Sequence, residues 1–161
     1  MIASNFKLDV NDPQHNYFRM TWQELYATAS GASKTFSDNP PRLSPSQFLN
    51  AALGFVNHLT MHHSIEERYV FPQLAERMPI FRRNLDLIQQ HKEIHEGMEK
   101  FEVYLKECKS RERELRMSEV KGLMDSWKDV LWLHLDREVV ELGAENMRKY
   151  WSLEELKRFA F

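Results

Sequence analysis

The stretch SPSQFLNAALGFVNHLTMHHSIEE at residues 44–67 carries the main signals for the fold. Ser44, Pro45 and Gln47 supply an N-cap, a proline at the first helical position and a side chain that completes a capping box, so we predict that a helix begins here. Apolar residues then recur at helical spacing, from Phe48 through Phe55 and beyond. The stripe runs into two histidines and two glutamates, so one helix combines a core-facing surface with residue types that bind metals.

Three other segments show the same helical periodicity. We predict a first helix from Asn11–Pro13 to Gly31, a third from Pro79 to about Cys108, and a fourth from near Ser118 to about Arg148. The second helix runs from Ser44 to about Met78, with a kink expected at Pro72 because proline removes a backbone donor. These predictions give an all-α, up-down-up-down four-helix bundle.

The domain boundaries follow from the same pattern. We expect one domain over residues 1–161, with a bundle core at about 13–148 and a C-terminal extension at 149–161. A capping-box pattern at Ser152–Glu155 predicts a short helix within that extension.

Composition excludes several classes of function. The net charge is −2, which argues against a nucleic-acid-binding surface or a polybasic membrane anchor. The single cysteine, Cys108, excludes an intrachain disulfide and a zinc site built on thiolates. The N-terminal residues show no secretory signal and no apolar run is long enough to span a bilayer, so we expect a cytoplasmic protein.

Histidine is the exceptional residue in this composition. Six of the seven histidines have a His, Asp or Glu four residues later, more than composition alone would give. Residues at i and i+4 share one helix face. The pairs are His58–His62, His62–Glu66, His63–Glu67, His91–His95, His95–Glu99 and His134–Glu138.

Two explanations compete for these pairs. Solvated helix faces account for His63–Glu67 and His95–Glu99, because acidic residues are common there. They do not account for His62, His91 and His134, whose helix neighbours are apolar. Buried polar groups need partners, and a metal ion supplies one.

Helix lengths add a second argument for a shared site. At about 1.5 Å per residue, ligands on antiparallel neighbours meet only when they lie equally far from the intervening connection. The candidates satisfy this condition at all three connections. They comprise five imidazoles and two carboxylates, enough for two metals bridged by the carboxylates: His15, His62, Glu66, His91, His95, His134 and Glu138. This donor set suits iron, manganese or zinc.

The ordered motifs resemble the hemerythrin-like family of HHE cation-binding domains. The matching segments are His15-Asn16, His62–Glu67 followed by Phe71-Pro72, His91–His95, and His134–Glu138. The resemblance implies a non-haem diiron centre in a four-helix bundle. The five histidines named above would be terminal ligands, and Glu66 and Glu138 would bridge two irons alongside an oxo or hydroxo group.

The chain also departs from the oxygen-carrying members of that family. Those proteins have an aspartate five residues after the last histidine, where this chain has Val139. The carboxylate lies instead at Glu138, a spacing found in HHE relatives. The segment between Glu66 and His91 is also longer than in the compact oxygen carriers. These differences bear on oxygen transport and leave the metal site intact.

Three polar residues remain beside the predicted ligands. His58 is either a core histidine or a group that lines the approach to the metals, where it would transfer a proton or hold a substrate. His63 is interpreted as a packing residue or a hydrogen-bond partner of a ligand. Glu141 shares a helix face with His134 and Glu138. It is interpreted either as a hydrogen-bond partner of the ligands or as a residue on a solvated face.

Two classes of function fit this sequence. The first is a binding protein that holds O2 or senses O2, NO or iron, favoured by the five neutral nitrogen ligands. The second is a diiron oxidase or oxygenase that acts on a small organic substrate, favoured by His58 and a kinked second helix. A structural or storage role for the metal is a third hypothesis. The sequence does not specify an oligomeric state.

Overall fold

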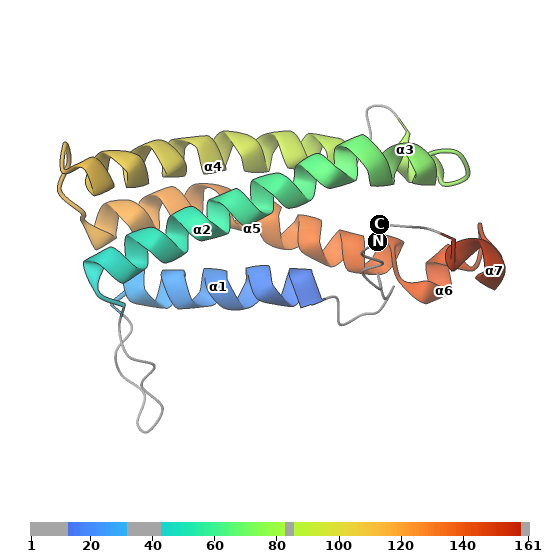
Figure 1. The fold of residues 1–161 in the computed structure, drawn as a ribbon, viewed down its shortest axis with the longest axis horizontal. Helices are drawn as coiled ribbons and strands as arrows, with labels where there is room; N and C mark the ends of the chain where they lie inside the picture. Colours follow the sequence, from blue (N-terminus) through green and yellow to red (C-terminus); the bar gives the residue numbers. More distant parts are fainter. Residues whose placement is uncertain (1–12, 32–42, 83–85, 159–161) are drawn as a thin grey trace, which may run out of the picture.

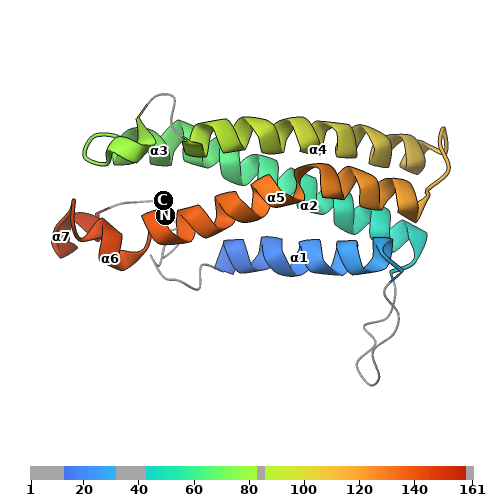
Figure 2. The same ribbon diagram turned by 180° about the vertical axis from the view of Figure 1, so that it is seen from behind.

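Four long helices form a closed bundle. The computed structural model describes residues 13–31, 43–82 and 86–158. The long helices are α1 (Pro13–Ala29), α2 (Pro45–Ile65), α4 (Asp86–Ser110) and α5 (Met117–Glu141). Each packs against the next, and α1 closes the ring against α5 (Figures 1 and 2). The prediction of an all-α, up-down-up-down bundle is confirmed.

The short elements refine the predicted boundaries. They are η1 (Glu66–Val70), α3 (Phe71–Leu74), η2 (Pro79–Phe81), α6 (Ala144–Met147) and α7 (Leu153–Leu156). The third long helix does not begin at Pro79, which opens a single 3₁₀ turn instead. The fourth does not continue to Arg148, because the extended backbone of Gly143 separates α5 from α6. The short helix predicted after residue 151 is present, with its capping box at Ser152 and Glu155.

A π-helical turn replaces the simple kink expected at Pro72. The segment η1 begins at Glu66, and the N–H of Phe71 donates to the carbonyl of Glu66 five residues earlier. A wider turn accommodates Pro72, whose missing N–H and bulky ring disfavour an α-helical turn. Turns of this kind occur often at functional sites.

Two apolar clusters fill the bundle at different levels. The larger lies among the four long helices, where Trp22 and Trp127 pack edge to face with ring centroids 4.7 Å apart. The smaller lies at the end where α3 and α6 are found and includes Phe71, Phe81 and Trp151. His62, His63 and His91 fall in sequence between the residues of the two clusters, and Glu138 does so along α5. No helix in the described ranges is long and apolar enough to cross a membrane.

One glycine allows α4 and α5 to approach closely. A Cβ atom on Gly97 would lie 2.4 Å from Cγ of Trp127, far inside van der Waals contact. The indole of Trp127 belongs to the larger cluster, so it has little room to move. Gly54 and Gly122 have no atom within 4 Å of such a Cβ.

We therefore expect Gly97→Ala to lower the free energy of unfolding by about 1–3 kcal/mol through overpacking. The matched control, Gly122→Ala in α5, should raise it by up to about 1 kcal/mol because alanine favours the helix. Urea unfolding of both variants, followed by circular dichroism, measures the difference. Equal stabilities of the two variants would contradict the close approach.

Candidate metal centre

The helices bring seven donor side chains together between the two apolar clusters. His15 lies near the start of α1, His62 and His63 near the end of α2, and Glu66 opens η1. His91 lies in the second turn of α4, and His134 and Glu138 lie one turn apart near the end of α5. Antiparallel packing places these helix ends at one level. The donor atoms form two groups, each with all its atoms within 4.8 Å of one another.

The first group joins α1, α2, η1 and α5. It consists of His15, His62, Glu66 and Glu138. Nε2 of His15 lies 3.1 Å from Oε2 of Glu138, and Nε2 of His62 lies 3.1 Å from Oε1 of Glu66. The side chain of His62 is 10% exposed, and that of Glu138 is fully buried.

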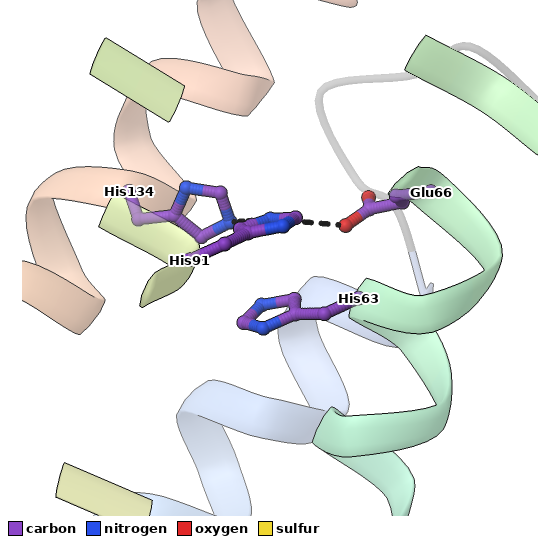
Figure 3. A group of neighbouring side chains, drawn as sticks. All are labelled: His63, Glu66, His91 and His134. Atoms are coloured by element: carbon purple, nitrogen blue, oxygen red, sulfur yellow. Dashed lines mark hydrogen bonds and ion pairs between the residues drawn. The ribbon is translucent and has the colours of Figure 1, made fainter. Parts of the chain in front are cut away.

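The second group joins α2, η1, α4 and α5. It consists of His63, Glu66, His91 and His134 (Figure 3). Nε2 of His91 lies 3.0 Å from Nε2 of His134 and 3.5 Å from Oε2 of Glu66. Glu66 belongs to both groups through its two oxygens. Glu138 also reaches the second group, with Oε2 3.3 Å from Nε2 of His134. Both carboxylates thus lie in positions suited to bridging.

His63 is brought into the donor set although the sequence interpretation left it outside. Its ring stacks on that of His91 at 3.9 Å between centroids. Both ring nitrogens are buried and have no hydrogen-bond partner among the described residues. A buried imidazole in that state is costly unless a ligand or ion engages it. The signal was present in the sequence, because Phe55, Leu59 and His63 follow one another at i+4 on the buried stripe.

His95, which the sequence predicts as a ligand, lies outside both groups. It is only partly buried, and its ring meets His63 edge-on at 5.4 Å between centroids. The i+4 spacing from His91 gave the correct face of α4. One helical turn, about 5.4 Å, nevertheless moves His95 away from Glu66 and toward the larger apolar cluster. The gathered set still contains five histidines and two glutamates, with His63 in the place expected for His95.

Two hydrogen-bond acceptors orient the histidines of the second group. Nδ1 of His91 lies 2.8 Å from Oε1 of Glu67, and Nδ1 of His134 lies 3.3 Å from Oε1 of Gln90. Each oxygen accepts from an Nδ1–H, which leaves the Nε2 lone pair directed at the shared site. Gln90 was not singled out from the sequence, because a glutamine on a helix carries no metal-binding signature.

The two carboxylates face only histidines. In the described part of the chain, every ion-pair partner of Glu66 and Glu138 is a histidine. Burial raises the pKa of Glu66, but hydrogen bonding and charge from His62 outweigh it, so that pKa falls well below its usual value. Burial and repulsion from Glu66 raise the pKa of Glu138. Glu66 is therefore the more acidic of the two carboxyl groups.

The pKa values of the buried histidines shift in opposite directions. Burial lowers the pKa of His91, but the hydrogen bond and charge of Glu66, with the charge of Glu138, raise it overall. Burial and the neighbouring His91 lower the pKa of His134 to about 3. Burial and His91 also lower the pKa of His63 well below its usual value. Imidazoles and carboxylates bind metal cations in their deprotonated forms, which the lowered pKa values of His63, His134 and Glu66 favour. The residues present therefore fit a cation at each group.

The remaining candidates lie at the margin of the site. Nδ1 of His58 lies 2.9 Å from the hydroxyl of Tyr17, and His58 is exposed. Both line a cavity of about 340 Å³ that also reaches His62. Glu141 turns away from the metal groups, because its side chain and carbonyl accept hydrogen bonds from Asn146.

Comparison with protein families agrees with this geometry. Residues 7–142 match the family described as the hemerythrin HHE cation binding domain. The chain belongs to this family. All seven residues of the two donor groups lie within the matched segment of this hemerythrin-like domain. Searches of curated proteins and of solved structures gave no match.

The different positions of His63 and His95 can be tested in the hemerythrin-like domain itself. We expect His63→Ala to lower the affinity for one of two metals by about tenfold or more. Loss of a residue that only orients a ligand already has an effect of this size. His95→Ala should keep both metals. Metal content after loading with Fe²⁺ and gel filtration measures the difference, with circular dichroism to verify folding. Retention of metal by the first variant and loss by the second would reverse the assignment.

Proposed function

We propose that the domain binds two iron ions and uses them to bind or sense a small diatomic gas, O2 or NO. The observation that carries the proposal is the pair of donor groups that share Glu66, each with imidazole and carboxylate donors. Membership of a cation-binding family supports it. The donors contain nitrogen and oxygen and no sulfur, a set that suits iron, with manganese and zinc as the alternatives.

In this proposal the protein fixes the ligands and keeps the site dry. His15 and His62 would hold one ion, and His63, His91 and His134 the other. Glu66 and Glu138 would lie between the two ions, and their negative charges would offset the cations. The flanking apolar clusters would exclude bulk water from the ions. When bound, ferrous iron supplies the electrons that O2 or NO takes up.

Five imidazoles favour gas binding over oxidative chemistry. Neutral nitrogen donors stabilise high-valent iron less than carboxylates do, so the site should resist cleavage of O2. The family resemblance places Val139 where oxygen carriers have an aspartate, which favours sensing over transport.

Anaerobic loading with Fe²⁺ tests the proposal. We expect about two irons per chain, since helical bundles with inward-facing carboxylate and histidine ligands of this kind typically hold two metal ions. On addition of O2 the absorption spectrum should change with a stoichiometric endpoint, and NO should compete. Zn²⁺ or Mn²⁺ retained in preference to iron, or one ion per chain, would overturn the diiron assignment.

The cavity beside His62 supports a second candidate, an oxidase or oxygenase for a small organic substrate. At about 340 Å³ it suits a small molecule, and it brings the His58–Tyr17 pair to the edge of the first donor group. His58 would then transfer a proton or orient the substrate.

Oxygen consumption by the iron-loaded protein distinguishes the two candidates. If the domain is an oxidase or oxygenase, at least one compound from a panel of small phenols and amines should give sustained turnover. His58→Ala should then lower the turnover rate by about 10²-fold or more at unchanged iron content. Asn57→Ala, at the adjacent exposed position, is the control. A single stoichiometric uptake of O2 with every compound would leave the binding protein as the function.

A further inference from the structure

Glu67 and Gln90 each accept a hydrogen bond from Nδ1 of a histidine in the second donor group, but they differ in charge. Glu67 presents a carboxylate to Nδ1 of His91, and Gln90 presents a neutral amide oxygen to Nδ1 of His134. The contact to the carboxylate is the shorter, at 2.8 Å against 3.3 Å. A charged acceptor makes an imidazole more basic than a neutral one and so a stronger metal donor. The two histidines are therefore unequal donors to the same site.

His91 is held by an aromatic neighbour as well as by Glu67. Phe71, one helical turn later, lies against the ring of His91 with centroids 5.2 Å apart. Both residues line an open cavity of about 630 Å³ on this side of the bundle, and the side chain of Glu67 is 46% exposed. Water there screens its charge, which limits the electrostatic effect without removing the hydrogen bond.

The other donor group does not share this contact. The atoms of Glu67 approach His91 on its outer side, away from Nε2, and no ion pair or hydrogen bond joins Glu67 to His15, His62 or Glu138 in the described residues. Any effect of Glu67 should thus fall mainly on one of the two metals.

We propose that Glu67 is a positioning residue that selectively raises the affinity of the metal held by His63, His91 and His134. It fixes the tautomer and orientation of His91, and its negative charge strengthens Nε2 as a donor. This inference rests on the proposed two-metal function.

Titration of the metal-free protein with Co²⁺ tests the inference through binding and absorption, independent of any activity. Glu67→Gln keeps an acceptor but removes the charge, and Glu67→Ala removes both. In the wild type we expect two binding events. Glu67→Gln should weaken one of them by about tenfold, the lower end of the range for such partners, and Glu67→Ala by more. The Co²⁺ affinity of the other event should stay within about twofold of the wild-type value, because that site lacks the contact with Glu67.

Glu99→Gln provides the matched control, because it makes the same chemical change at an exposed position of α4. It should leave both events and the Co²⁺ absorption bands unchanged. The bands of the affected site should shift in both Glu67 variants, and thermal unfolding of the metal-free proteins establishes that they are folded.

The possible results separate the two proposals. Two events in the wild type with unchanged affinities in both Glu67 variants would overturn the role of Glu67 alone. Equal weakening of both events would overturn its selectivity. Fewer than two Co²⁺ ions bound by the wild type would overturn the two-metal function and this inference with it.

Discussion

The burial of two carboxylates is the main electrostatic constraint on this bundle. Glu66 and Glu138 lie inside the helices with only histidines as ion-pair partners. Removing an ion from water costs several kcal/mol even after relaxation. Close contacts with polar or charged partners in the interior must offset this cost. In the protein alone, close contacts with the surrounding imidazoles provide part of the compensation. The convergence of several imidazole nitrogens on the same two carboxylates is the arrangement that a pair of cations would satisfy.

The rest of the fold follows from holding these donors at one level. The apolar clusters on either side exclude water and stabilise the packing of the helices. This packing fixes the position of each donor along the bundle axis. The close approach at Gly97 and Trp127 locks α4 against α5 within one of these clusters. The π-helical turn begins at Glu66, where the chain passes from the larger cluster into the smaller one.

The two donor groups meet the surface through different side chains. His62 of the first group borders the cavity that contains His58 and Tyr17. His91 of the second group is contacted by Glu67, which lines a separate cavity near α3 and η2. A small molecule therefore has a route to the edge of one group, while the other is influenced through a hydrogen bond. Ions bound at the two groups would therefore have different surroundings.

The sequence by itself determined the helical class, the order of the long helices and most of the donor set. Periodic apolar residues and capping signals specify helices, and i+4 spacing specifies which side chains share a face. These are local properties. Depth inside the bundle is not local, because it depends on how far each helix slides and rotates against its neighbours.

The choice between His63 and His95 was therefore made only by the tertiary structure. Both lie on faces that carry other candidate ligands, yet packing buries His63 beneath His91 and leaves His95 one turn farther along α4. The contacts of Glu67 and Gln90 likewise join helices far apart in the sequence. Spacing along one helix can name the residues able to bind a metal, but only the packing of four helices decides which nitrogen and oxygen atoms converge.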